Sequence, residues 1–136
     1  MHVAIADTSA LYAAIDAAEV EHRACINALA DAELRLVFPA LAIAEVCQLV
    51  ERRLGPLVEA QFVATLGDYD VRAPMPDDWL RISELVRRYA DFPFGAVDAS
   101  VVALAERLET DIVITLDRRH FAAIRPRHCE HLRLLP

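Results

Sequence analysis

Hydrophobic residues recur along this chain at two spacings, and the changes of spacing mark its predicted elements. Short runs rich in β-branched residues predict strands at residues 3–6, 34–38, 69–72, 112–116 and 132–135. Apolar residues at helical spacing predict helices from residue 10 onward and at 21–30, 40–54, 56–66, 79–89, 97–108 and, for one turn, 121–124. Because helices separate the strands, we predict an α/β fold with helices on both faces of one parallel sheet.

Two acidic residues directly follow strands of this predicted sheet. Asp7 comes after the strand at 3–6, and Asp117 comes after the strand at 112–116. Ligands of parallel α/β sheets bind outside the carboxyl ends of the strands. We therefore expect the side chains of Asp7 and Asp117 to lie at the same edge of the sheet.

Two further acids lie in predicted helices, within segments that have almost no other polar residue. Glu45 lies in the segment LAIAEVC at residues 41–47, and Asp98 lies in GAVDASVV at residues 95–102. An ionised carboxylate in apolar surroundings is costly unless it is paired, hydrogen-bonded or bound to a metal ion. Glu45 and Asp98 therefore need an explanation that an ordinary surface acid does not.

Each of the four acids has an ordinary structural explanation when it is considered alone. Asp7, Asp98 and Asp117 are placed to cap helices. Glu45 can reach water or an arginine along the flank of its helix. Together, however, four acids at one sheet edge would raise one another's pKa values unless cations lay between them. Carboxylate oxygens suit Mg²⁺ or Mn²⁺, and the absence of a histidine from the set argues against zinc.

The composition predicts one domain that spans residues 1–136. Hydrophobic residues make up 56% of the chain, enough for a substantial core, and the apolar runs are too short for a membrane span. The three cysteines are far apart and form no C-x-x-C pair, which indicates reduced thiols and a cytoplasmic protein. The group His128-Cys129-His131 lacks the second ligand pair of a zinc site, so we expect a turn there.

The charged residues exclude several function classes. A formal net charge of −7 argues against a polyanionic partner, but cations bound at four acids would remove much of that excess. All fourteen basic residues are arginine, which excludes enzymes that form a Schiff base on lysine. The absence of lysine also argues against a P-loop nucleotide site, and against receiver domains and haloacid-dehalogenase-like phosphatases, which normally rely on one.

Four motifs occur in order along the chain: DTSAL at 7–11, Glu45 within its helix, VDAS at 97–100 followed by AERL at 105–108, and TLDRRHF at 115–121. These motifs resemble those of PIN domains, and more narrowly those of VapC-type ribonuclease toxins from bacterial toxin–antitoxin pairs. Each motif is weak alone, but together they span the chain from Val3 to Leu135 with the spacing of that family. Relatives often have Pro-Leu-Asp where this chain has Pro93-Phe94-Gly95, a departure that concerns the shape of a loop.

The resemblance implies a three-layer α/β/α fold and an endoribonuclease that hydrolyses RNA with the help of Mg²⁺ or Mn²⁺. It implies Asp7 and Asp98 as the principal metal ligands and Glu45 and Asp117 as the other two catalytic, metal-binding acids. A hydroxyl near the first acid is common in the family, and Ser9 can supply it. The resemblance also implies a homodimer that is inhibited by a VapB-type antitoxin.

Two further sets of residues are candidates for contacts with partners. Four arginines after the last acid can contact RNA phosphates, with ordinary surface positions as an equal alternative: Arg118, Arg119, Arg125 and Arg127. Two successive helices carry more apolar residues than one core face needs, namely Leu49, Leu54, Leu57, Val58 and Phe62. We expect these to help form a groove for an antitoxin helix and a dimer surface, with burial in the core as the alternative for each.

Other functions stay open at this point. One is a housekeeping PIN nuclease that has no antitoxin. Another is a binding module with an inactive acidic site, or a two-carboxylate phosphatase of a different fold. RNA cleavage that requires Mg²⁺ or Mn²⁺ and is lost in Asp98→Ala would discriminate the nuclease from the binding module.

Overall fold

A parallel sheet of five strands forms the centre of the protein. The computed structural model describes all residues from 1 to 136, and the strand order is β3–β2–β1–β4–β5 with every neighbouring pair parallel. The strands are β1 (His2–Ala6), β2 (Leu34–Pro39), β3 (Val71–Arg72), β4 (Ile112–Ile114) and β5 (Arg133–Leu135). The predicted α/β class with a parallel sheet is therefore confirmed.

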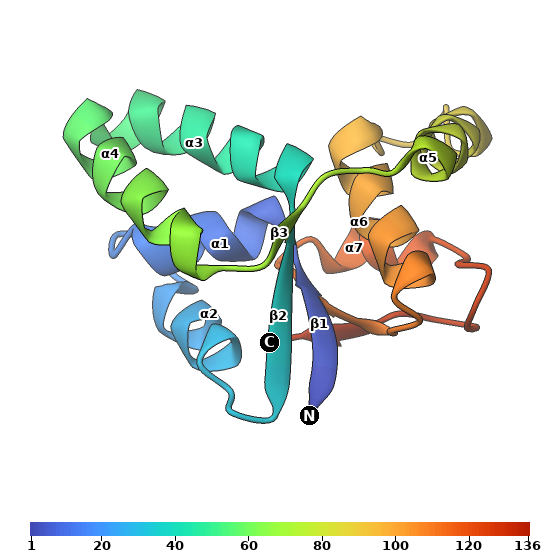
Figure 1. Ribbon diagram of the computed structural model, residues 1–136, viewed down its shortest axis with the longest axis horizontal. Coiled ribbons are helices and arrows are strands. Elements are labelled where there is room, and N and C mark those ends of the chain that lie inside the picture. The colour runs from blue at the N-terminus through green and yellow to red at the C-terminus, as the bar shows by residue number, and fades with distance from the viewer.

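Helices cover both faces of the sheet, which gives the predicted three layers (Figure 1). One face carries α1 (Thr8–Ile15), α2 (His22–Leu29), α3 (Ala40–Leu54) and α4 (Pro56–Thr65), and the other carries α5 (Pro76–Arg88), α6 (Ala96–Arg107) and α7 (Arg118–Ala123). A short 3₁₀ helix, η1 (Leu66–Asp68), leads from α4 towards β3. No helix is long and apolar enough to cross a membrane.

Alternation along the strands divides the core into two halves. Ile5, Val37 and Val113 are in register across β1, β2 and β4 and pack under α5, α6 and α7. Their neighbours in sequence point to the opposite face, as the two-residue period of a strand requires. Ala4 and Ala6 are small, so α1 and its neighbours pack closely on the central strand. Both halves of the core thus hold β1 rigidly at the centre of the sheet.

Three predicted boundaries differ from the structure near the carboxyl edge. The strand at 112–116 ends at Ile114. The N–H of Thr115 still bonds to the carbonyl of Leu135 on β5, but the N–H groups of Leu116 and Asp117 bond to side-chain hydroxyls instead of a strand. The helix placed at 121–124 begins at Arg118, because Asp117 caps it. The strand at 69–72 is reduced to Val71–Arg72, since the chain is still completing the turn after η1 at Tyr69.

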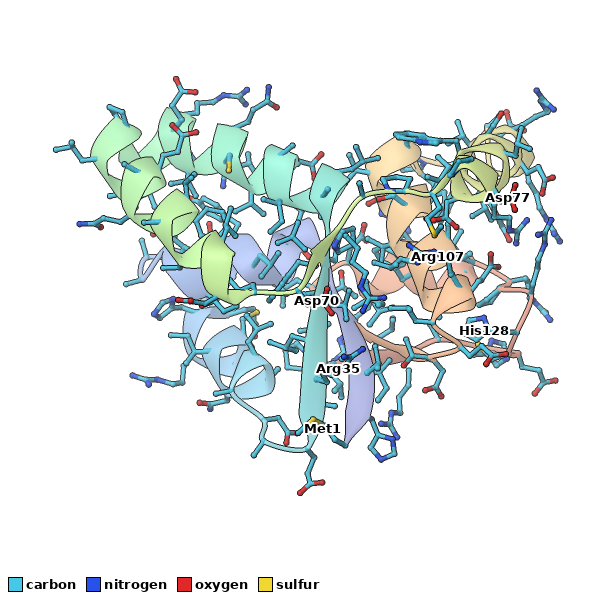
Figure 2. The ribbon with its side chains drawn as sticks, in the orientation of Figure 1. Met1, Arg35, Asp70, Asp77, Arg107 and His128 are labelled. Carbon is cyan, nitrogen blue, oxygen red and sulfur yellow. The ribbon has the colours of Figure 1, made fainter.

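Ion pairs between helices fix the outer layers. The guanidinium of Arg107 on α6 lies 3.0 Å from the carboxylate of Asp78 on α5. At the sheet edge, Arg72 forms a two-bonded pair with Asp70, and the charge of Arg35 further lowers the pKa of Asp70. Figure 2 shows Arg35 and Asp70 together beside β2, and Arg107 on α6. Asp70 and Asp78 therefore each have an arginine partner.

Candidate functional site

Asp7 lies where β1 gives way to α1, at the carboxyl end of the central strand. Its backbone N–H donates to the carbonyl of Ile114 on β4 over 2.9 Å, which places the end of β1 beside the end of β4. The residue stands in the N-cap position of α1, but its side chain makes no capping hydrogen bond. Capping alone therefore does not explain this carboxylate, which is only 3% exposed.

Two hydroxyl groups hold one oxygen of Asp7 and leave the other free. Oδ2 accepts hydrogen bonds from Thr115 Oγ1 at 2.8 Å and from Ser9 Oγ at 3.0 Å. Oδ1 is buried and has no hydrogen-bond partner. Burial raises the pKa of Asp7, while the hydroxyl bonds act in the opposite direction. A buried carboxylate oxygen without a partner is unfavourable, so this atom is suited to receive a proton or a cation.

Asp98 projects from the first turn of α6. It is the third residue of the helix, and the N–H of Gly95 donates to its Oδ2 over 3.3 Å, so it supports the helix start without being the N-cap residue. Burial, together with the negative charges of Asp7, Asp117 and Glu45, raises the pKa of Asp98 to about 6. The electrostatic influence of all three on Asp98 shows that the four acids share one region.

Glu45 enters this region from α3. The helix begins at Ala40, directly after the carboxyl end of β2, so its first two turns lie at the same edge of the sheet. Glu45 is half-buried, and α3 packs against α6, which carries Asp98. No arginine forms an ion pair with Glu45, Asp7 or Asp98, unlike Asp78 on α5 and Glu106 on α6.

Asp117 is both a helix cap and a member of the acidic group. Its carboxylate accepts the backbone N–H of His120 at 3.3 Å, and Nδ1 of the His120 ring lies 2.7 Å from the same carboxylate. The edge of the His120 ring meets the ring of Phe92, with centroids 4.8 Å apart. Asp117 is thus a helix cap, as its ordinary explanation predicted, and the contacts with His120 hold its carboxylate in a fixed orientation.

The four acids approach one another without forming a closed metal cage. No three His, Cys, Asp or Glu side chains in the structure are gathered closely enough to enclose an ion. Mutual repulsion opposes such a cage in the absence of cations. An open arrangement is suited to Mg²⁺, which proteins bind through one or two carboxylates, with water and substrate phosphates as the other ligands.

The fold and the order of the acids match a known family. The family model described as PIN domain matches residues 4–125. The chain belongs to the PIN-domain family. Within it, the chain is 39% identical over 127 residues to Ribonuclease VapC26 of Mycobacterium tuberculosis (strain ATCC 25618 / H37Rv), covering 90% of this chain and 92% of that relative. This identity places the chain among the VapC-type PIN domains, as its motifs indicated.

Solved structures share the architecture of this PIN domain. The sarcin–ricin-loop-cleaving toxin VapC20 of Mycobacterium tuberculosis superimposes with a TM-score of 0.77 at 19% identity, over 84% of this chain and 89% of that one. VapBC2 of Rickettsia felis, solved bound to a fragment of its promoter DNA, gives a TM-score of 0.69 at 14% identity, over 98% and 99% of the two chains. At such identities the likeness concerns the fold alone, and it excludes a phosphatase of a different fold.

Two residues of this PIN domain site were not singled out from the sequence. Thr115 is fully buried and bonds to Asp7 through its hydroxyl, which also accepts the N–H of Asp117 at 2.9 Å. His120 holds Asp117 as described above. Both lie within the motif TLDRRHF, but the chemical predictions for that motif concerned its acid and its two arginines. The predicted hydroxyl of Ser9 is confirmed as a donor to Asp7.

An apolar groove lies on the other half of the PIN domain. Its volume is about 460 Å³, and eleven of its thirteen lining residues are hydrophobic. Val58 and Phe62, two of the five predicted residues, line it together with side chains of α1, α2 and β2. Leu49 and Leu54 pack against the core, and Leu57 is 81% exposed outside the groove. The turn expected around His128 is also observed, as a series of bends at residues 127–131.

Proposed function

We propose that this PIN domain is a metal-dependent endoribonuclease and the toxin of a VapBC-type toxin–antitoxin pair. The main support is the group of four carboxylates at the carboxyl edge of the sheet, three of which have no basic partner. The pKa of Asp98 is raised to about 6 partly by the charges of the other three acids, which is the electrostatic condition that bound cations relieve. A relative of 39% identity carries the name ribonuclease.

In this proposal, Asp7 and Asp98 hold Mg²⁺ or Mn²⁺, and Glu45 and Asp117 complete the site. The buried, unpartnered Oδ1 of Asp7 and the all-carboxylate donor set both fit a hard divalent cation. When bound, such an ion lowers the pKa of a water molecule and offsets negative charge on the phosphodiester.

The chain's own groups orient these ligands. The hydroxyls of Thr115 and Ser9 fix Oδ2 of Asp7, so that Oδ1 remains the free oxygen. Nδ1 of His120 fixes the carboxylate of Asp117. Fixed ligands of this kind require little rearrangement when substrate arrives.

RNA cleavage by the purified protein tests the nuclease. We expect cleavage with Mg²⁺ or Mn²⁺, none in EDTA, and a loss of at least a hundredfold in kcat for Asp98→Asn. Glu51→Gln is a matched control, because Glu51 is exposed on α3 and has no ion pair. Full activity of the Asp98→Asn protein, or equal cleavage with and without EDTA, would show that the metal-site proposal is wrong.

We also propose that the apolar groove receives a helix of a VapB-type antitoxin, and that the protein forms a homodimer. An amphipathic helix can bury its apolar face in a groove lined by Leu11, Leu29, Phe38, Val58 and Phe62. A charged residue in that groove would oppose such binding, so Phe62→Glu should abolish inhibition by the antitoxin. RNA cleavage by the free protein should change little, since α4, which carries Phe62, lies on the opposite face of the sheet from α6 and α7 (Figure 1).

Growth on expression distinguishes a toxin from a housekeeping nuclease. We expect growth arrest with the wild-type protein, relief by a cognate antitoxin encoded nearby, and no arrest with Asp7→Ala. Arrest that persists in Asp7→Ala would contradict the toxin function, even if the protein cleaves RNA. Sedimentation of the free protein at two concentrations measures the proposed dimer.

A further inference from the structure

The last part of the chain has a charge opposite to that of the rest. Residues 118–136 contain five arginines and one acid, a net charge of +4, whereas residues 1–117 contain nine arginines and twenty acids, a net charge of −11. The change of sign occurs directly after Asp117. In a protein with a net charge of −7, this local excess marks one region as attractive to a polyanion.

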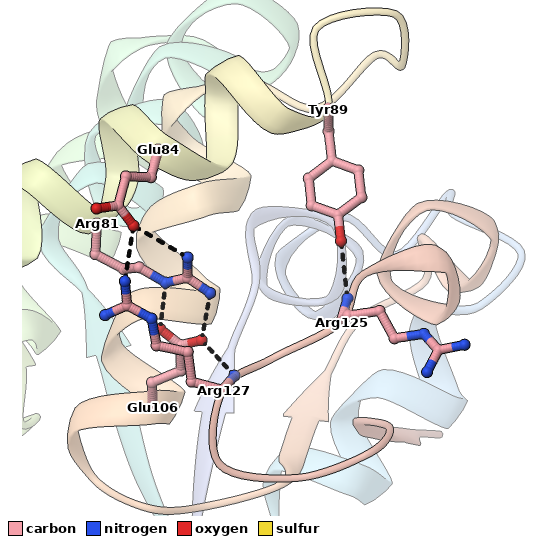
Figure 3. A network of polar contacts seen from close by, with 6 residues as sticks. All are labelled: Arg81, Glu84, Tyr89, Glu106, Arg125 and Arg127. Atoms are coloured by element: carbon pink, nitrogen blue, oxygen red, sulfur yellow. Dashed lines mark hydrogen bonds and ion pairs between the residues drawn. The ribbon is translucent and has the colours of Figure 1, made fainter.

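Part of this basic segment is fixed to the helices beside it through its backbone. The N–H of Arg125 donates to the hydroxyl of Tyr89 over 3.0 Å, and the N–H of Arg127 donates to Glu106 over 2.8 Å (Figure 3). Glu106 is in turn held by two bonds from Arg81, and Pro126 between the two arginines is buried. The backbone is therefore rigid where the arginine side chains leave it.

Two guanidinium groups of this region have no acidic partner. The side chain of Arg125 is exposed and points away from the polar network in Figure 3, whereas Arg127 is paired with Glu84 at 2.8 Å. The guanidinium of Arg88, at the end of α5, lies over the ring of Tyr89 at 5.7 Å. Arg88 and Arg125 line one open hollow, in which Glu130 is the sole acid.

We propose that this hollow, lined by Arg88, Arg125, Pro126, Arg127, His128, Cys129 and Glu130, binds backbone phosphates of the RNA strand that leaves the acidic site. Arginine presents a planar fork of donors that matches phosphate oxygens, and an unpaired arginine gives up no ion pair on binding. The inference rests on the proposed ribonuclease function and assigns part of its substrate surface.

Helix α7 and the aromatic rings packed against it connect the hollow to the acidic site. Helix α7 has six residues and a length of about 9 Å, so the segment that begins at Arg125 lies one short helix away from Asp117. The ring of Tyr89 packs against that of Phe94, with centroids 5.7 Å apart, and Phe94 packs against Phe121 of α7, with centroids 6.1 Å apart. A strand bound at both places would thus contact one connected, rigid part of the protein.

Binding of a labelled single-stranded RNA to the Asp98→Asn protein tests this surface. The double variant Arg88→Gln/Arg125→Gln should bind on the order of tenfold more weakly. The slope of log affinity against log salt concentration should become less steep by about 1.4, since each phosphate contact on a single strand contributes about 0.7. The matched control is Arg23→Gln/Arg52→Gln, which removes the same charge from exposed, unpaired positions on α2 and α3.

The outcomes separate this surface from the proposed activity. With Asp98 intact, the Arg88/Arg125 double variant should raise KM for RNA with little change in kcat, while the control changes neither. Equal losses of RNA affinity in both double variants, or no loss in either, would overturn the proposal. It would also be overturned if the Arg88/Arg125 double variant lost antitoxin binding while its RNA binding was unchanged. Absence of RNA cleavage by the wild-type protein would contradict the ribonuclease function without altering the comparison of the two double variants.

Discussion

Replacing Asp98 with asparagine should stabilise the protein in the absence of metal. A rise of the Asp98 pKa from 3.8 to about 6 corresponds to about 3 kcal/mol of unfavourable free energy for the charged form above pH 6. Asp98 is half-buried, so screening by solvent reduces this value, and we expect a gain of about 1–2 kcal/mol. For a chain of this length, that gain raises Tm by roughly 4–8 °C.

The effect should depend on pH in a defined direction. Between about pH 4 and 6 the folded protein binds more protons at Asp98 than the unfolded chain does, so stability falls as the pH rises. Above pH 6 the charged Asp98 lowers the free energy of unfolding by its full amount. The advantage of Asp98→Asn should therefore be present at pH 7.5 and largely absent near pH 4. Asparagine can still accept the N–H of Gly95, so the start of α6 is preserved.

Thermal unfolding followed by circular dichroism in EDTA measures this prediction, with Glu51→Gln as the control for loss of one negative charge. Added Mn²⁺ should raise the Tm of the wild type and have much less effect on Asp98→Asn. An Asp98→Asn protein that is less stable than the wild type at pH 7.5 would refute the reasoning. It would mean that the carboxylate makes a favourable interaction in the folded protein that outweighs repulsion.

Three other substitutions test individual contacts. Thr115→Val should lower the free energy of unfolding by about 1–3 kcal/mol in urea denaturation, because it removes a buried donor to Asp7, and Thr115→Ser should recover most of the loss. His120→Leu should lower kcat for RNA cleavage at least tenfold, because it removes the ring nitrogen that bonds to Asp117. His120→Asn keeps a donor near the position of Nδ1, so its kcat should stay within a few-fold of the wild-type value. Equal losses of kcat in both variants would contradict an orienting role for His120. Arg81→Met should lower the free energy of unfolding by about 3–5 kcal/mol in the same urea assay, because it leaves the charge of the nearly buried Glu106 without its arginine partner. Glu19→Gln, which breaks the exposed pair with Arg53, should lower it by less than about 1 kcal/mol.

The sequence predicted the layers and the meeting of distant acids because both follow from local pattern and a general rule. Strands that alternate with helices form a parallel sheet, and the carboxyl ends of such strands share one edge. Asp7 and Asp117 could be placed at that edge without knowledge of strand order. Glu45 and Asp98 were identified by the apolar residues around them, since each is the one acid in an apolar segment of its helix.

The supporting contacts could not be predicted, because they depend on register. The pairing of Ala6 with Ile114 brings Thr115 beside Asp7, and a shift of one residue would turn that hydroxyl to the other face. The early end of β4 has the same origin, since Ser9 and Thr115 take the N–H groups of Leu116 and Asp117. Arg88 was not singled out from the sequence, because its place beside Arg125 follows from how the end of α5 packs against the C-terminal segment.

The contact between Thr115 and Asp7 joins residues 108 positions apart, and this has a consequence for synthesis on the ribosome. β4 lies next to β1 in the middle of the sheet, and Asp117 and His120 follow it by only a few residues. A nascent chain therefore lacks one flank of its central strand and one acid of the site until β4 and the start of α7 have left the exit tunnel. In the proposed ribonuclease, the complete acidic site forms only after β4 has paired with β1, so it cannot assemble on the first half of the chain alone.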